Sequence, residues 1–269
     1  MRVAVIGHVE WVEFARVERV PGAGEIVDAI SFLEEAAGGG AVAAVQMARL
    51  TGGCDFFTAL GDDLLARRSI ARLSALGVTV HPAKRPRPTR RGWVHVDARG
   101  ERTITVIGEK LVPQLDDPLS WDVLDAADAV FFVAGGPGVL QRARAARVLG
   151  ATTRSLPPGP GVELDAAIGS SNDASEAFAV GDLKPEPHLS VWTAGASGGH
   201  WRAADGREGS YDAAPVPGPV ADAYGCGDSF AAATTLGLAR GATIEDALAL
   251  GSLCGAEALT REGPYGTAA

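Results

Sequence analysis

Cysteine and basic residues are scarce in this 269-residue chain. Its three cysteines include no CxxC pair, so we expect neither a disulfide framework nor a thiolate metal site. The 24 Lys and Arg residues form no basic run and are outnumbered by 33 Asp and Glu residues, which argues against a nucleic-acid partner. The five histidines lack the i, i+4 spacing that a helical zinc site needs. An acidic chain with reduced thiols is expected to be cytoplasmic.

Long apolar runs are also missing. Gly, Asp, Glu or Arg interrupts every apolar stretch before it reaches the roughly 18 residues of a membrane span. The first residues, MRVAVIGHVEWVEF, lack the long apolar region and the small-residue cleavage site of a signal peptide, so we interpret them as a buried strand. We therefore expect no membrane partner.

Short apolar runs alternate with helical patterns along the chain. RVAVIG and CDFFTALG are typical of buried strands, whereas GGAVAAVQMARL and VLQRARAARVLG have the periodicity of helices. This alternation predicts an α/β fold with a central, mostly parallel sheet and helices on both faces. The segment from Arg154 to Pro187 is rich in Pro, Gly, Ser and Asp, and its sequence predicts little beyond loops and short strands.

Two stretches break this alternation. WVEFARVERV and RGWVHVDARGERTITVIG alternate polar and apolar residues, as half-exposed antiparallel strands do. We assign them to a small antiparallel β lid, at about residues 9–34 and 86–108, within a single domain that spans residues 1–269. Such strands cannot bury their apolar face alone, so the lid is expected to close over a site or to pair with a second copy in a homodimer.

The most informative stretch is DAYGCGDSFAAATTLGLARG, residues 222–241. Gly225 and Gly227 allow backbone N–H groups to turn toward one point, where the positive end of the following helix also acts. We therefore expect this element to hold an anion such as a phosphate. Asp228, in the first turn of that helix, would either cap the helix or serve as the base for an incoming hydroxyl group, and the spacing alone leaves both open.

This stretch resembles the C-terminal signature of the ribokinase-like (PfkB) carbohydrate kinase family, in which Asp-Thr-x-Gly-Ala-Gly-Asp-x-Phe precedes an Ala-rich helix. Other segments resemble the family in the same order along the chain: RVAVIG, PGAGEIVDA, AGGGAVAAVQMARL, TALGDD and VWTAGASGGHW. The resemblance implies a ribokinase-like three-layer α/β/α fold. It also implies an ATP-dependent phosphotransferase that moves the γ-phosphate to an alcohol group of a sugar, a sugar derivative or a nucleoside.

The same resemblance implies a role for each residue of the motif. Asp228 would be the catalytic base, and Gly225, Cys226 and Gly227 would form the anion hole that neutralises the transferred phosphoryl group. Cys226 replaces the usual Ala and is expected to be a small apolar filler rather than a nucleophile. Asp222 matches an acidic residue beside a monovalent-cation site, so the resemblance leaves activation by K⁺ open.

Two further segments are implied to bind the nucleotide and its metal. Thr193, Gly195 and Gly198 match a turn of the family's nucleotide pocket, so ATP is the expected cofactor. Glu176, in the Asp-Ala-Ser-Glu sequence that begins at Asp173, is similar to the residue that organises Mg²⁺ and the phosphates. These acidic residues would equally suit an exposed helix start.

The acceptor site departs from the family's pattern. The family usually has an Asp that grips sugar hydroxyls where this chain has Val12, and the flanking Glu10 and Glu13 are the candidate replacements. Gly38 and Gly39, in the glycine pair before a helix, are the other implied substrate-binding residues.

A second departure is Val42, at a position where the family often has an Asn that contacts the substrate. These changes keep open an alternative, a non-catalytic nucleotide- or sugar-binding protein on the same fold. A nicotinamide-dependent oxidoreductase would need a GxGxxG motif after the first strand, but only Gly7 is present there.

Overall fold

A computed structural model describes residues 1–156 and 161–266 of the chain. Its main element is a nine-stranded sheet, in the spatial order β13 (Glu208–Tyr211), β12 (Gly199–Ala203), β11 (Leu189–Thr193), β10 (Ala166–Ser170), β9 (Val148–Thr152), β8 (Ala129–Phe132), β1 (Val3–Ile6), β4 (Cys54–Gly61) and β5 (Val78–Arg85). The strands from β11 to β5 are parallel, while β12 and β13 run antiparallel at one edge. The prediction of a mostly parallel sheet is confirmed.

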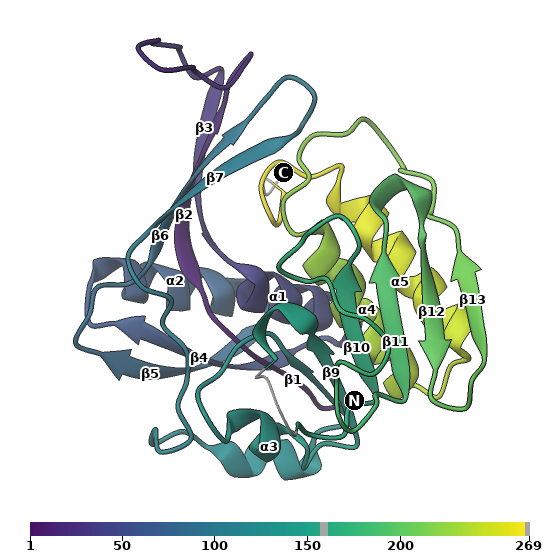
Figure 1. The fold of residues 1–269 in the computed structure, drawn as a ribbon. Helices are drawn as coiled ribbons and strands as arrows, with labels where there is room; N and C mark the ends of the chain where they lie inside the picture. The colour runs from purple at the N-terminus through teal and green to yellow at the C-terminus, as the bar shows by residue number, and fades with distance from the viewer. Residues whose placement is uncertain (157–160, 267–269) are drawn as a thin grey trace.

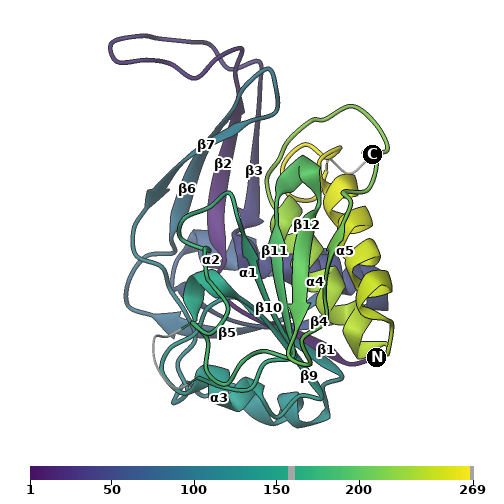
Figure 2. The same cartoon turned by 45° about the vertical axis from the view of Figure 1, so that its right-hand side comes forward.

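Helices cover both faces of this sheet (Figures 1 and 2). One face carries four helices over a core that includes Phe56 and Leu236: α1 (Gly39–Thr51), α2 (Leu64–Ala75), α4 (Cys226–Ala239) and α5 (Ile244–Ala258). The other face is covered more thinly, by α3 (Val139–Ala143) and the 3₁₀ helix η1 (Trp121–Ala126) over Phe132. The three-layer α/β/α prediction is therefore confirmed. None of the helices in the described residues has the length and apolar character needed to cross a membrane.

The segment VLQRARAARVLG is only partly helical. Helix α3 ends at Ala143, and Val148 already begins β9, so the prediction of one continuous helix is wrong. Strand β9 lies between β8 and β10, with both of its faces covered. A strand buried on both faces shows no polar–apolar alternation, so its sequence cannot be told from that of a buried helix by periodicity.

A second sheet of four strands projects from the main body (Figures 1 and 2). Its order is β3 (Ser31–Ala37), β2 (Glu10–Arg16), β6 (Arg91–Val96) and β7 (Arg102–Ile107), and we call these four strands the lid. The outer pairs are antiparallel, and the central pair β2–β6 is parallel. The strands lie within the segments 9–34 and 86–108 that the sequence indicated, except that β3 continues to Ala37.

The two faces of the lid have different surroundings. Phe14, on the inner face, packs edge-on against Tyr224 with 5.0 Å between ring centres. On the outer face, the Arg68 guanidinium of α2 lies 4.1 Å from the ring centre of Trp11. Phe32, on the same outer face, is 54% exposed. The even-numbered residues of β2 therefore face the loop before α4, and the odd-numbered ones lie on the opposite face, where Arg68 covers Trp11.

Three hydrogen bonds join the lid to the loop that precedes α4. The Nη1 group of Arg16 donates to the carbonyl of Ala221 at 3.0 Å, and the Nη1 group of Arg102 donates to the carbonyl of Ala223 at 2.9 Å. The N–H of Ala223 in turn donates to the carbonyl of Gly100, in the β6–β7 turn, at 3.2 Å. The lid is thus held against the chain that leads into the glycine motif.

Candidate active site

The candidate site lies at the carboxyl edge of the parallel strands, where loops and helix N-termini meet in open α/β sheets. The start of α1 packs against the ends of two strands: a Cβ atom on Gly7 would lie 2.9 Å from Cα of Gly40 and 3.0 Å from Cβ of Val133. The start of α4 packs on α1 just as closely, because a Cβ atom on Gly225 would lie 2.8 Å from Cγ1 of Val42. Two helix N-termini therefore meet at this edge.

The N-terminus of α4 has backbone N–H groups without an acceptor inside the helix. Gly225 is the N-cap, with a φ of 77° that favours glycine, and the first hydrogen bond of the helix runs from the N–H of Ser229 to its carbonyl at 2.9 Å. The N–H groups of Cys226, Gly227 and Asp228 precede this bond and have no acceptor within the helix. A Cβ atom on Gly227 would meet nothing within 4 Å. The arrangement suits an anion in front of the helix.

Asp228 is not the cap of this helix. Its carboxylate accepts no hydrogen bond from any described residue, and the N-cap position belongs to Gly225. Asp63 at the start of α2 shows what a capping Asp looks like here: it accepts hydrogen bonds from the N–H of Ala66 at 2.8 Å and of Thr89 at 2.7 Å. The capping interpretation of Asp228 is therefore wrong, and its carboxylate is left available.

The surroundings of Asp228 perturb its protonation. A Cβ atom on Gly39 would lie 2.6 Å from Oδ1 of Asp228, so the carboxylate occupies the space that only glycine leaves at the start of α1. Burial and the nearby Glu176 carboxylate raise the pKa of Asp228 to about 6, although the charges of Arg102 and Arg154 oppose this rise. A carboxylate with a pKa near neutrality, without a structural partner, is a candidate general base.

Gly38, the residue before Gly39, lies against Glu10 at the start of the lid strand β2, since a Cβ atom on Gly38 would lie 3.4 Å from Cγ of Glu10. The N–H of Gly38 donates to the hydroxyl oxygen of Tyr224 at 3.0 Å, and a Cβ atom on Gly38 would lie 3.1 Å from Cδ2 of His8. Glu10 is 6% exposed, and its Oε1 lies 3.1 Å from Nη1 of Arg90. Burial raises the pKa of Glu10, whereas the positive charge of Arg90 opposes that shift. Nothing in the sequence distinguishes Arg90 from its neighbours in the run TRRGW.

The structure separates Glu13 from the other residues of the expected acceptor site. Glu13 lies on the outer face of β2 and pairs with Arg91 of β6, so it does not reach the carboxyl edge of the sheet. Val12, on the inner face, is 1% exposed and packs beneath β6. Val42 is 2% exposed and packs against Gly225. Neither valine replaces the polar contact that the family's pattern has at its position.

The segment that is expected to contact the nucleotide forms a turn after β11. Thr193 ends β11, and the short 3₁₀ helix η3 (Gly195–Ser197) follows. Gly195 and Gly198 have φ values of 62° and 75°, and a Cβ atom on Gly198 would stand 1.9 Å from the carbonyl oxygen of Tyr211. Nδ2 of Asn172 would lie 3.6 Å from a Cβ atom on Gly195. The ends of β10 and β11 are therefore side by side, and glycine is required at the end of the turn.

Arg154 holds the two acidic residues expected near the metal. It belongs to the 3₁₀ helix η2 (Thr153–Ser155) after β9, and its Nη2 lies 2.9 Å from Glu176 Oε1 and 2.5 Å from Asp173 Oδ2. Hydrogen bonds from Ser175, together with Arg154, lower the pKa of Asp173 to about 2. The described residues contain no cluster of three or more His, Cys, Asp or Glu side chains able to hold a metal ion. The sequence carries no signal for Arg154, which lies in its least interpretable segment.

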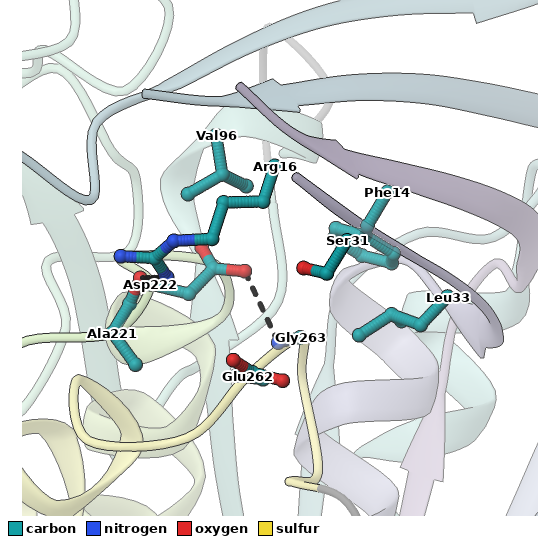
Figure 3. Close-up of a pocket in the computed structure, with 9 residues that line it drawn as sticks. All are labelled: Phe14, Arg16, Ser31, Leu33, Val96, Ala221, Asp222, Glu262 and Gly263. Atoms are coloured by element: carbon teal, nitrogen blue, oxygen red, sulfur yellow. Dashed lines mark hydrogen bonds between the residues drawn. The ribbon is translucent and has the colours of Figure 1, made fainter. Parts of the chain in front are cut away.

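Asp222 ties the motif to the C-terminal loop. Its carboxylate accepts hydrogen bonds from the N–H of Tyr224 at 2.8 Å and of Gly263 at 3.2 Å, and burial raises its pKa. Figure 3 shows it beside Arg16, in a small pocket between the lid and the motif. The monovalent-cation site at Asp222 stays a prediction.

Burial raises the pKa of the Cys226 thiol, as expected of a small apolar filler and not of an activated nucleophile.

Comparison with solved structures identifies the fold. The fold is similar to the ribokinase of Giardia lamblia (17% identity, covering 98% of this chain and 94% of that chain, TM-score 0.77). It is also similar to Arabidopsis thaliana ribokinase complexed with ribose and ATP (18%, 97% and 93%, TM-score 0.75) and to the adenosine kinase of Sinorhizobium meliloti (19%, 98% and 95%, TM-score 0.75). At such low identity these likenesses establish a ribokinase-like fold.

The family follows from the sequence itself. The family model described as pfkB family carbohydrate kinase matches residues 1–154 and 163–268. The chain therefore belongs to the pfkB family of carbohydrate kinases, which confirms the resemblance seen in the motifs. A search of curated proteins found no match.

Proposed function

We propose that this protein transfers the γ-phosphate of ATP to an alcohol group of a small sugar-like or nucleoside acceptor. The observation that carries the proposal is the Asp228 carboxylate. It lies where the N-termini of α1 and α4 meet, has no structural partner among the described residues, and has a pKa raised to about 6. A base with this pKa is ionised at neutral pH and still able to take a proton in the transition state.

In the proposed mechanism, Asp228 accepts the proton of the acceptor hydroxyl as its oxygen attacks the γ-phosphorus. The N–H groups of Cys226, Gly227 and Asp228 stabilise the charge on the transferred phosphoryl group, because the first turn of the helix holds them in place without an acceptor of their own. The lid, held to the loop before α4 by Arg16 and Arg102, keeps water from the hydroxyl.

The residues present fit ATP and, less directly, Mg²⁺. The open space beyond Gly227 accommodates a phosphate group, and the turn from Thr193 to Gly198 would contact the nucleotide. Glu176 is engaged by Arg154, so it would hold Mg²⁺ through water molecules while the phosphates supply direct ligands. Bound Mg²⁺ would neutralise the phosphate charge during transfer.

The similar structures support the class of acceptor. The Arabidopsis thaliana ribokinase was solved with ribose and ATP, and the Sinorhizobium meliloti protein is an adenosine kinase. We infer an acceptor of similar size for this chain. The departures at Val12 and Val42 favour a different pattern of hydroxyl contacts from the family's usual one.

The second candidate is a non-catalytic binding protein, which the same two valines favour. An ADP-release assay with MgATP, run across pentoses, hexoses, sugar acids, sugar phosphates and nucleosides, separates the two. Acceptor-dependent release that is lost in Asp228→Asn supports the kinase. Calorimetric binding of MgATP without acceptor-dependent release from any acceptor would instead support the binding protein.

A further inference from the structure

Positive charge lines the acceptor side of the site, and phosphoryl transfer as proposed does not use it. Arg90 lies just before β6, and Lys110 follows β7, so both approach the site from the lid. The residues expected to grip neutral hydroxyls are instead apolar, as Val12 and Val42 show. These two positions therefore offer no polar partner to a sugar hydroxyl, whereas Arg90 and Lys110 offer two positive charges to an anion.

Arg90 is held beneath the lid with part of its hydrogen-bonding capacity unused. Its side chain is 12% exposed, and its Nη1 lies 3.1 Å from Oε1 of Glu10. Its Nε is buried without a hydrogen-bond partner among the described residues, as is Nδ1 of the neighbouring His8. A buried polar group without a partner costs about 1–3 kcal/mol. An acceptor oxygen supplied by a ligand would remove that cost.

Lys110 lies on the segment that crosses from the lid to the main sheet. At one end of this segment, a Cβ atom on Gly108 would lie 3.9 Å from Cα of Arg90. At the other end, the carbonyl of Pro113 accepts the N–H of Gly136, after β8, at 2.8 Å. Lys110 is exposed and makes no hydrogen bond or ion pair with any described residue. Its ammonium group is thus accessible, on the segment that leaves the lid beside Arg90.

The positive charges of Lys110 and Arg90 act on each other and on His8. Burial and the charge of Arg90 lower the pKa of Lys110, partly offset by Glu10, and Arg154 lowers it further. Burial and the charges of Lys110 and Arg90 likewise lower the pKa of His8 to about 3. Like charges that act on one another are unfavourable unless an anion binds among them. Arg154 already pairs with two carboxylates, whereas among the described residues Arg90 pairs with Glu10 and Lys110 with none.

We propose that the acceptor carries an anionic group, a carboxylate or a phosphate, which Lys110 and Arg90 bind while its reacting hydroxyl faces Asp228. This inference rests on the proposed kinase function and deepens it. Both cations form charge-assisted hydrogen bonds with such groups, and the guanidinium binds them in a fixed geometry. A neutral sugar would leave the ammonium of Lys110 without a partner. Lys110 and Arg90 determine specificity and touch no reacting atom.

Matched acid and neutral acceptors test this proposal. D-Gluconate is compared with D-glucose, and D-fructose 6-phosphate with D-fructose, so that the two pairs distinguish a carboxylate from a phosphate. The variants are Lys110→Gln, Lys110→Arg and the control Lys184→Gln, whose exposed side chain precedes the amino end of β11 at the opposite edge of the sheet. Initial rates give kcat and KM, and calorimetry with a non-hydrolysable ATP analogue gives binding independently of turnover.

We expect the acidic member of at least one pair to be preferred. Lys110→Gln should raise its KM by roughly tenfold or more, the worth of one charge-assisted hydrogen bond, with kcat nearly unchanged. Lys110→Arg should retain most of the affinity, and Lys184→Gln all of it. The KM of a neutral acceptor should not respond to Lys110→Gln.

Transfer to neutral acceptors in preference to acidic ones would overturn this inference and leave the kinase intact. An equal effect of Lys110→Gln on both members of a pair would overturn it as well. Failure of transfer to every acceptor would contradict the proposed function. Calorimetry would then test separately whether the protein binds acidic ligands through Lys110. Binding of an acid that Lys110→Gln weakens supports the inference, and binding of no acid overturns it.

Discussion

Replacing Asp228 with Asn is expected to stabilise the protein at neutral pH while it removes activity. The pKa of Asp228 is raised from its ordinary 3.8 to about 6, so the folded state carries the ionised carboxylate at a cost. One pKa unit corresponds to about 1.4 kcal/mol, which sets an upper limit of about 3 kcal/mol on that cost. The side chain is partly exposed, so solvent screening reduces the expected gain to roughly 1.5 kcal/mol.

The gain in stability from Asp228→Asn should grow as pH rises. Between pH 3.8 and about 6 the folded protein keeps a proton that the unfolded chain has released, so wild-type stability falls as pH rises through this window. Asn does not titrate, so the two proteins should be similarly stable near pH 4 and should differ fully above neutrality. Thermal unfolding followed by circular dichroism should show the variant about 3–6 °C higher in Tm at pH 8. A lower Tm for the variant at pH 8, or a difference independent of pH, would refute this reasoning.

Four further predictions follow from the geometry. Gly39→Ala places a methyl group 2.6 Å from Oδ1 of Asp228 and should cut kcat by about 10²-fold in steady-state assays, so an unchanged kcat contradicts the contact. Arg154→Gln removes a positive charge that lowers the pKa of Asp228, so the acidic limb of the pH profile of kcat/KM should move to higher pH. A shift of this limb to lower pH would contradict the role of Arg154 in setting that pKa. Light scattering should show a dimer that Phe32→Glu, on the outer face of the lid, converts to a monomer; a wild-type monomer rejects pairing through the lid. Replacing K⁺ by tetramethylammonium should lower turnover, and equal rates would remove Asp222 from any cation site.

The sequence predicted what depends on short-range patterns. The glycine motif from Gly225 to Asp228 lies at a helix N-terminus as expected, because glycine conformations and helix starts are set by neighbouring residues. The parallel sheet and the lid strands followed from the alternation of apolar runs. The choice between cap and free carboxylate at Asp228 needed the structure, since it depends on Gly39, which lies far away in the sequence.

Long-range contacts account for what the sequence could not predict. Arg154 follows β9, Arg90 precedes β6 and Lys110 follows β7, so only the folded chain allows their charges to act on one another. No local spacing marks any of them as part of a site. Glu13 was expected to bind the acceptor in place of the family's Asp, and it does not reach that site for a simpler reason. Residues of a strand alternate between faces, so a carboxylate one position away from Val12 points to the opposite side of the lid.

Transfer of labelled phosphate from γ-labelled ATP to the best acceptor, measured in parallel for wild type and Asp228→Asn, tests the role of Asp228 most directly. The variant should be slower by about 10²–10⁴-fold, the usual worth of a general base. Its affinity for MgATP should stay close to that of wild type, because the N–H groups at the start of α4 do not depend on the carboxylate. Transfer by the variant within about threefold of the wild-type rate would show that Asp228 is not the base.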